Sequence, residues 1–329
     1  MMGKVDKAAQ IEYTDIYLRM IQKGVPRMLE VVLLGTGGTM PLRNRWLTAC
    51  WMRSQGSAIL IDCGEGTQIA MKAAGVSFTA IELLCLTHFH ADHVSGLPGL
   101  LLSMGNEGRT APLTIAGPQG LQRIVDGLRV IAPELPFPLV LQEWQSPVQT
   151  IQAAGMTITA FAVLHTLPCF GYRIHLPRAG KFDPVRAKAQ NIPMAVWSIL
   201  QKQPTADYEG ILYHQEQVLG PPRAGLTVTY CTDSRPLPQI AKYAENADLF
   251  LCEGMYGDPT KQEKALETLH MTFAEAAQLA ADAKAKALWL THYSPSMQNP
   301  FDYLPNAQAI YPNAQCGEDG MRIQLQYCE

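Results

Sequence analysis

The segment CLTHFHADHVSGL, residues 85–97, places three histidines and one aspartate within six positions, between two apolar runs. His88 and His90 are two residues apart, so their side chains lie on one face of an extended segment, and Asp92 and His93 follow where the chain turns. Neutral imidazole and carboxylate suit zinc or manganese, and four such groups in six residues can supply two adjacent metal sites. A polar surface loop is the alternative interpretation of this cluster taken alone.

Four more residues of ligand type follow strand-like runs or begin a helix. They are His165 in FAVLHTLPCFGYRI, Asp233 in TYCTDSRP, His270 in LETLHMTFAEAA and His292 in ALWLTHYSPSM. Each one alone is more often a satisfied structural residue than a ligand. Because α/β proteins place ligand groups in the loops at the carboxyl ends of strands, the set as a whole favours a metal site.

The elements that must position these residues follow from the apolar pattern. Short β-branched or apolar runs, punctuated by glycine, alternate with helical stretches, which predicts an α/β fold. We expect strands at residues 29–34, 58–62, 83–86, 113–116, 156–162, 170–175, 227–231, 249–253 and 287–290. We expect helices at residues 67–74, 97–104, 119–130, 237–244 and 272–283, the last opened by a capping box of Thr272 and Glu275.

Composition limits the class of protein. With 329 residues, 47% of them hydrophobic and 17% charged, the chain can bury a large core as one domain or two merged halves. The net charge of −3 provides no global basic field, so a nucleic acid would have to be held by local patches. The eight cysteines are scattered without a C-x-x-C pair, and the sequence contains no signal-peptide core and no membrane span. These features predict a cytoplasmic protein with reduced core thiols.

Two segments depart from the α/β pattern. Residues 1–27 precede the first strand-like run and are expected to form an N-terminal extension, either an appended helix or a mis-called start, ahead of a domain at 28–329. Residues 178–224 have weak periodicity, a Gly-Pro-Pro exit and many Lys, Arg and Gln residues, which predicts an inserted arm. An irregular surface excursion that packs only locally is the alternative.

The ordered series of motifs resembles the metallo-β-lactamase superfamily and, within it, the ribonuclease Z family, whose members trim the 3′ trailer of precursor tRNA. The motifs LLGTGGTMPLRNR, LIDCGEGTQ, LTHFHADHVSGLPGLL, GPQGL, HTLPCFGYRI, LGPPRAG, CTDSRP, HMTFAEAA and LTHYSP follow in the family's order from Met28 nearly to the C-terminus. The resemblance implies an αββα sandwich of two mixed sheets flanked by helices.

The resemblance also implies the metal ligands and their roles. One metal would be held by His88, His90 and His165, the other by Asp92, His93 and His292, with Asp233 as the bridge. Two Zn²⁺ per subunit are implied, with Mn²⁺ as the alternative; such a pair lowers the pKa of a shared water and neutralises phosphate oxygens during in-line attack. Asp92 would also orient the water or accept its proton, His270 would stabilise or protonate the leaving oxygen, and Glu253 would orient His270.

A precursor tRNA, cut by hydroxide attack to leave a 3′-hydroxyl, is the implied substrate. A homodimer is implied as well, with the arm of one subunit serving the active site of the other. Expected contacts are Thr36, Gly37, Pro41, Arg43 and Arg45 near the cut, and Lys181, Arg186, Lys188 and Lys202 on the arm. The chain departs from the family at Trp46, where Asn is usual, at IPMAVWSIL in the arm, where a Gly-Pro turn is usual, and after His292, where an arginine is often found.

Other functions fit the residues less well. GTGGTM resembles a dinucleotide fingerprint, but Met40 replaces the third glycine and Pro41 follows, so it is interpreted as a backbone turn near the phosphates. A di-iron oxidoreductase of the superfamily would have Glu where His90 stands. Thioester or lactone hydrolases have no need of the arm or the PLRNR loop, and a non-catalytic RNA-binding relative would have lost ligands. A metal-dependent phosphodiesterase acting on small or cyclic phosphodiesters is the second candidate.

Overall fold

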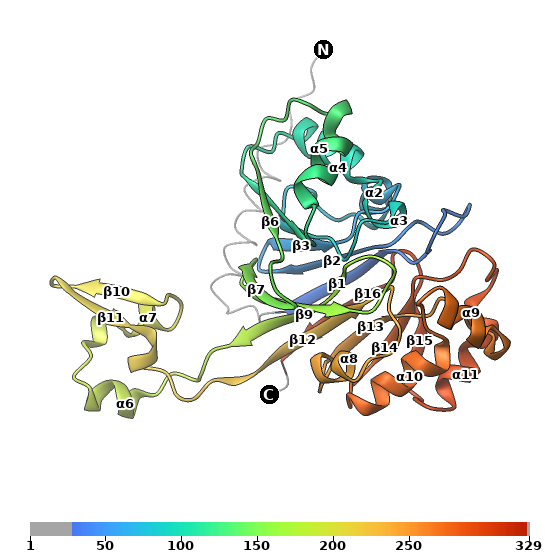
Figure 1. Ribbon diagram of the computed structural model, residues 1–329. Helices are drawn as coiled ribbons and strands as arrows, with labels where there is room; N and C mark the ends of the chain where they lie inside the picture. The colour runs from blue at the N-terminus through green and yellow to red at the C-terminus, as the bar shows by residue number, and fades with distance from the viewer. Residues whose placement is uncertain (1–27, 328–329) are drawn as a thin grey trace, which may run out of the picture.

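Two seven-stranded sheets stack face to face in the computed structural model, which describes residues 28–327 (Figure 1). The first sheet has the order β16 (Arg322–Gln326), β1 (Met28–Gly35), β2 (Ala49–Ser54), β3 (Ser57–Ile61), β4 (Ile81–Cys85), β5 (Leu113–Gly117) and β6 (Leu139–Glu143). The second has the order β15 (Ala314–Cys316), β14 (Leu288–Thr291), β13 (Leu249–Glu253), β12 (Arg223–Cys231), β9 (Cys169–Arg178), β8 (Met156–Val163) and β7 (Val148–Ala153). Both sheets mix parallel and antiparallel pairs.

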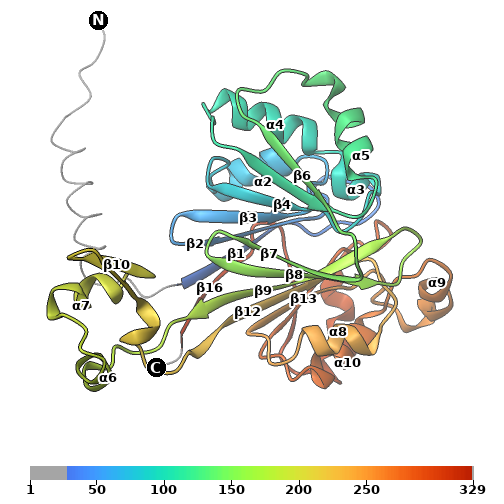
Figure 2. The ribbon, with the colours of Figure 1, turned by 60° about the vertical axis from the view of Figure 1, so that its left-hand side comes forward.

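Helices cover the outer face of each sheet (Figures 1 and 2). On the first sheet lie α2 (Thr67–Ala74), α3 (Ala91–Val94), α4 (Leu97–Asn106) and α5 (Leu121–Leu128), and on the second lie α8 (Pro238–Tyr243), α9 (Gln262–Glu267), α10 (Phe273–Asp282) and α11 (Leu304–Gln308). This is the expected αββα sandwich. The N-terminal extension expected at residues 1–27 lies outside the described residues. None of the helices within residues 28–327 is long and apolar enough to cross a membrane.

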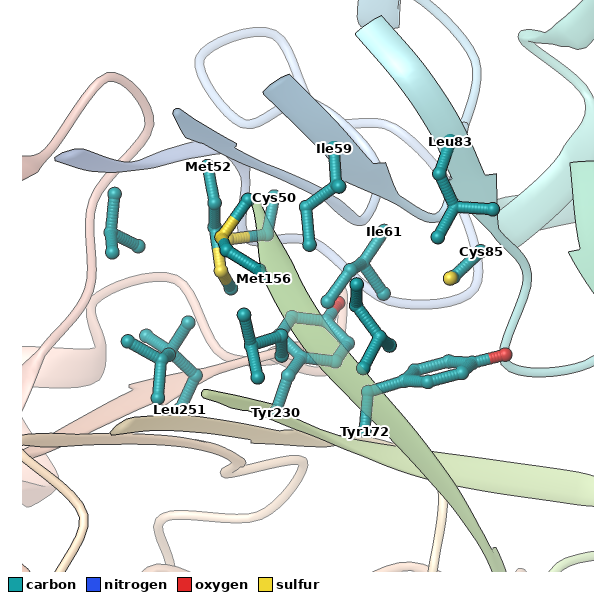
Figure 3. Packing of buried hydrophobic residues seen from close by; sticks show 14 of the residues in the cluster. Cys50, Met52, Ile59, Ile61, Leu83, Cys85, Met156, Tyr172, Tyr230 and Leu251 are labelled. Atoms are coloured by element: carbon teal, nitrogen blue, oxygen red, sulfur yellow. The ribbon is translucent and has the colours of Figure 1, made fainter. Parts of the chain in front are cut away.

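The continuous apolar runs of the central strands arise because both faces of each sheet are buried. In β1, Leu29, Val31 and Leu33 point into the layer between the sheets, whereas Val32 and Leu34 pack against the helices. The layer between the sheets is shown in Figure 3. This packing fixes where each strand ends. The positions of the loops that follow, which carry polar side chains, are therefore fixed as well.

The nine expected strands and five expected helices are all present, within a few residues of their predicted bounds, and the capping box at Thr272 is confirmed. Five strands of the sandwich were not predicted: β2, β6, β7, β15 and β16. Four of them, β6, β7, β15 and β16, are edge strands whose polar residues interrupt the apolar runs from which strands were predicted.

Residues 178–224 form a folded projection that extends from the ends of β9 and β12 (Figure 1). It contains α6 (Pro184–Ala189), α7 (Met194–Leu200) and a hairpin of β10 (Thr205–Tyr208) and β11 (Ile211–His214). The projection has its own small core of Ala187, Ile192, Val196, Leu200, Ala206, Val218 and Leu219. Isolated pairing of Phe182 with Leu219 closes its base.

Candidate metal centre

The residues expected to bind metal lie in loops at one edge of the sandwich. The loop after β4 and the short α3 supply His88, His90, Asp92 and His93, and the loops after β8, β12 and β14 supply His165, Asp233 and His292. The structure brings all seven together in groups whose ligand atoms lie within 4.8 Å of one another. Segments about 200 residues apart in sequence therefore meet because strands of both sheets end at the same edge.

The first group consists of His88, His90, His165 and one oxygen of Asp233. His90 Nδ1 lies 2.9 Å from His88 Nε2 and 3.3 Å from His165 Nε2. Both Nε2 atoms are 3.8 Å from Asp233 Oδ2. Ligand atoms about 2.0–2.1 Å from a tetrahedral zinc ion are about 3.4 Å apart, so these spacings fit one such ion.

The second group uses the other oxygen of Asp233. Oδ1 lies 3.2 Å from Nε2 of His93 and 3.2 Å from Nε2 of His292. Asp92 Oδ2 completes the group at 3.3 Å from His292 Nε2 and 3.6 Å from His93 Nε2. Because its two oxygens face different groups, Asp233 has the geometry of a bridging ligand.

The polar contacts within the site need positive charge to balance them. Nε2 of His93 and Nε2 of His292 face each other at 3.2 Å, close enough for both to contact one cation. Asp233 Oδ1 is buried and has no hydrogen-bond donor among residues 28–327. A buried, unpaired carboxylate oxygen is costly, and coordination of a cation removes that cost. The donor set therefore fits two divalent metal ions.

Burial and charge shift the pKa values of the candidate ligands, and for three of the histidines and Asp92 they favour the form that binds metal. Burial lowers the pKa of His88, His90 and His165, so their imidazoles stay neutral with a free lone pair. Burial raises the pKa of Asp92, but His93 and His292 outweigh it and hold that pKa below its usual range. The pKa of His93 lies well above its ordinary value despite burial because Asp233, Asp62 and Asp92 surround the ring. This negative surrounding attracts cations.

Asp62, directly after β3, contacts one candidate ligand and is linked through Thr87 to a second, and it was not among the predicted site residues. Its Oδ2 lies 2.9 Å from His93 Nδ1, and its Oδ1 accepts hydrogen bonds from the amide and hydroxyl of Thr87. The Thr87 hydroxyl in turn lies 3.1 Å from His88 Nδ1. These contacts leave Nε2 of both histidines turned toward the site. The signal was available in LIDCGEG, where an acidic residue follows a buried strand as Asp233 does.

We expect Asp62→Asn to weaken metal binding about 10–100-fold, the usual cost of losing a carboxylate behind a ligating histidine. The cause is the loss of the carboxylate that Asp62 presents to His93 and Thr87. Titration against a chromophoric chelator measures the change. Asp248→Asn, which alters a carboxylate bonded to Thr227 and Lys286, is the matched control. An unchanged metal affinity in Asp62→Asn would show that Asp62 does not support metal binding.

Three carboxylate or imidazole residues of the site have left-handed backbone conformations. Asp62 has φ 60°, Asp233 φ 52° and His292 φ 56°, each directly or nearly directly after a strand. Non-glycine residues adopt this conformation at a cost of about 1–3 kcal/mol, and the surrounding structure must compensate for it. The sharp turn directs each side chain into the site instead of along the strand.

The turn GTGGTM packs directly against the second group. The Thr39 amide donates a 2.6 Å hydrogen bond to Asp92 Oδ2. A Cβ on Gly38 would lie 2.7 Å from Cε1 of His292, so only glycine allows this approach. The turn therefore packs against two candidate ligands, Asp92 and His292.

His270 and Glu253 form a pair beside the ligands. Glu253 is fully buried at the end of β13, and its Oε2 lies 3.0 Å from His270 Nδ1. Its Oε1 accepts a hydrogen bond from the Ser234 amide, which fixes the carboxylate. Burial lowers the pKa of His270, but Glu253 and Asp233 raise it to about 9. His270 can therefore hold a proton close to the metal site.

The residues expected to contact substrate differ in their surroundings. Pro41 and Arg43 are exposed, whereas Gly37 is buried and its amide donates to Trp46 O. Thr36 is buried, with both its amide and its hydroxyl donating to Asp319 Oδ1. Arg45 donates to the carbonyls of Met297 and Gln298 and lies over the ring of Tyr293. Thr36 and Arg45 thus have structural partners.

The expected contacts on the arm are all exposed: Lys181, Arg186, Lys188 and Lys202.

The sandwich and its edge site define a protein of the metallo-β-lactamase superfamily. The fold is shared with human tRNase Z, short form, at 24% identity and a TM-score of 0.64, over 89% of this chain and 98% of that chain. It is also shared with the metallo-beta-lactamase fold protein YhfI from Bacillus subtilis at 20% identity and a TM-score of 0.66, over 91% and 99%. Family models described as "Beta-lactamase superfamily domain" and "Anti-Pycsar protein Apyc1" match residues 215–293 and 29–124.

Relatives define the family more narrowly. The chain is 53% identical to a ribonuclease Z of Lachnoclostridium phytofermentans over 91% of this chain and 99% of that protein. It is 54% identical to a ribonuclease Z of Agathobacter rectalis over 92% of this chain and 100% of that protein. The chain belongs to the ribonuclease Z family, as its motifs predicted.

Proposed function

We propose that this protein is a metal-dependent endoribonuclease that removes the 3′ trailer of precursor tRNA and leaves a 3′-hydroxyl on the tRNA. The observation that carries the proposal is the pair of ligand groups sharing Asp233, with the protonated His270 beside both, in a chain of the ribonuclease Z family. The two groups would hold two Zn²⁺ ions, or Mn²⁺ as the alternative, because imidazole and carboxylate suit these metals.

The chain's own residues supply proton transfer and orientation. Two bound divalent ions would supply Lewis acidity, which makes water more acidic and offsets negative charge on a phosphate. Asp92, held by the Thr39 amide, orients the attacking water or accepts its proton. As the water oxygen bonds to phosphorus, the bond from phosphorus to O3′ of the tRNA breaks, and His270 donates its proton to that O3′. Glu253 keeps His270 protonated and oriented.

The experiment that tests the function is cleavage of a 3′-extended precursor tRNA by purified protein with added zinc or manganese. The product end is mapped, and Asp92→Ala serves as the inactive control. A single cut beside the discriminator nucleotide, absent in the variant, is the expected result. If the protein leaves the precursor intact but hydrolyses small or cyclic phosphodiesters, the second candidate function replaces this one.

Residues 178–224 project far enough from the metal centre to contact a part of the substrate that is distant from the cut. β12 runs eight residue steps from Arg223, at the base of the arm, to Cys231, beside the metal centre. At about 3.3 Å per step the base of the arm is about 26 Å from the site. Residues this far from the cut would contact the body of a tRNA, or the tRNA bound to the other subunit of the proposed homodimer.

We expect the triple variant Lys181→Gln, Arg186→Gln and Lys188→Gln to bind precursor tRNA more weakly and with a shallower dependence on salt. All three side chains are exposed on the arm. Each lost phosphate contact should reduce the slope of log affinity against log salt by about 0.7–0.9. Binding titrations across a salt series measure the slope.

The matched control for the arm variant is Lys72→Gln, Arg123→Gln and Lys242→Gln, which removes the same charge from exposed sites on the sandwich. Hydrolysis of a small nitrophenyl phosphodiester should be unaffected in both triple variants. Equal slopes for the two variants would show that only net charge matters and would contradict a binding role for the arm.

The remaining proposals concern assembly and location. We propose a homodimer, testable by light scattering of the purified protein. We also propose a cytoplasmic enzyme, which is consistent with the seven cysteines of residues 28–327 being free and buried.

A further inference from the structure

Arg235 connects three of the loops that build the site. It lies two residues after Asp233, and its amide donates a 3.0 Å hydrogen bond to the carbonyl of Leu164, the neighbour of His165. Its guanidinium donates to the carbonyl oxygen of His270 and forms a two-pronged ion pair with Glu275. The loops that carry His165, Asp233 and His270 are thus joined through one residue, by the amide of Arg235 on one side and its guanidinium on the other.

The ion pair is anchored to a rigid element. Glu275 lies in the first turn of α10, where its Oε2 accepts a 2.9 Å hydrogen bond from the Thr272 amide and its Oε1 accepts a 2.8 Å bond from Gln262. The side chains of Arg235 and Glu275 are only 11% and 19% exposed. A planar, bidentate and largely buried guanidinium–carboxylate pair holds its geometry far better than an exposed ion pair. Arg235 therefore holds the carbonyl of His270 at a fixed position relative to α10.

The backbone of the His270 segment needs such support. Leu269 has φ 56°, a left-handed conformation that a leucine adopts only under constraint. The carbonyl of Leu269 lies 3.3 Å from Nδ1 of His165, and the next carbonyl, that of His270, accepts from Arg235. Two consecutive carbonyls are thus fixed, that of Leu269 by His165 and that of His270 by Arg235.

We propose that Arg235 is a positioning residue that sets where His270 delivers its proton, acting through the His270 backbone and Glu275. The inference rests on the proposed function, in which His270 protonates the leaving O3′. The Glu253 contact fixes one ring nitrogen of His270, but not the backbone from which the ring projects. Arg235 supplies that second constraint. Lysine in its place has one point charge, so it cannot contact both Glu275 oxygens and the His270 carbonyl in the same plane.

The test compares substrates that differ in their need for a proton on the leaving group. Arg235→Lys is assayed on precursor tRNA, whose O3′ must be protonated, and on thymidine 5′-(p-nitrophenyl phosphate), whose nitrophenolate leaves as an anion. We expect kcat for the precursor to fall about 10–100-fold, as small misplacements of catalytic groups do. The nitrophenyl ester should be hydrolysed within a factor of about three, with metal content unchanged, since all proposed ligands are intact.

Arg173→Lys is the matched control, because the Arg173 guanidinium is also partly buried and donates to backbone carbonyls, those of Tyr243 and Glu245, away from the site. It should affect both substrates equally and slightly. If Arg235→Lys lowers the yield of folded protein, Glu275→Gln removes the anchor instead and should show the same preference for the nitrophenyl ester. Equal losses on both substrates, or no loss on either, would overturn the proposal.

Failure of the inference is distinguishable from failure of the proposed function. If wild-type protein does not cut the precursor, the proposed function is wrong. The Arg235→Lys variant is then tested on the phenyl and nitrophenyl esters of thymidine 5′-phosphate in place of the precursor and the nitrophenyl ester. A larger loss on the phenyl ester than on the nitrophenyl ester in Arg235→Lys would still support the positioning role. Equal losses on the two esters would reject it.

Discussion

Asp233→Asn is expected to abolish cleavage of precursor tRNA and to leave the purified protein with little bound metal. The substitution preserves shape but turns one of the two oxygens into an NH₂ group, which repels a cation. Oδ2 faces His88 and His165, and Oδ1 faces His93 and His292, so the NH₂ group meets one of the two groups whichever way the amide turns, and both groups lose the negative charge of the carboxylate. Loss of one partner from a buried ionic contact costs about 3–5 kcal/mol, which corresponds to about 10²–10⁴ in metal affinity.

Elemental analysis after gel filtration, together with circular dichroism to check the fold, measures this effect. Asp92→Asn is the informative comparison, because Asp92 contacts only the second group and its loss should remove one ion and spare the other. Full metal content in Asp233→Asn would show that Asp233 is not a bridge. Loss of both ions from Asp92→Asn would show that the two groups do not bind independently.

The fold and the candidate ligands were predictable because each has a local signal in the sequence. Strands such as β1 and β13 are buried on both faces, which makes them short apolar runs that stand out from their surroundings. The candidate ligands follow these runs directly, and the close spacing of His88 to His93 left a metal site and a polar surface loop as alternatives until the other candidate ligands were considered with it. The order of motifs along the chain then related the distant His165, Asp233 and His292 to that cluster.

The contacts through which other residues support the site were not predictable. Asp62 follows a buried strand, which marks it as a candidate, but its role arises from Thr87, 25 positions away, and the role of Arg235 arises from His270 and Glu275, 35 and 40 positions away. Thr36 and Arg45 show the converse. Their residue types suit phosphate contacts, but the fold gives them Asp319 and the carbonyls after His292 as partners. Residue type indicates what a side chain can bind, and only the fold shows what it does bind.

His270→Ala is expected to reduce cleavage of precursor tRNA about 10²–10⁴-fold, the usual contribution of a general acid. The leaving O3′ is a poor leaving group unless it is protonated, and His270, paired with Glu253 beside the candidate ligands, is the proposed donor. Hydrolysis of a nitrophenyl phosphodiester should change much less, because its leaving group needs no proton. Rates for both substrates with wild-type protein and the variant measure the difference.

The pH profile provides a second, independent check on His270. Because Glu253 and Asp233 outweigh burial and raise the pKa of His270 to about 9, the acid form exists below that pH and disappears as the pH rises through it. Bound cations lower this value by repulsion, so we expect wild-type cleavage of the precursor to fall on the alkaline side, at or below about pH 9. The His270→Ala variant should lack this fall. His175→Ala, which removes a half-buried histidine that contacts Thr227 away from the site, should retain it. An identical alkaline fall in the His270→Ala variant would assign the titrating group elsewhere and would contradict the role of His270 as the acid.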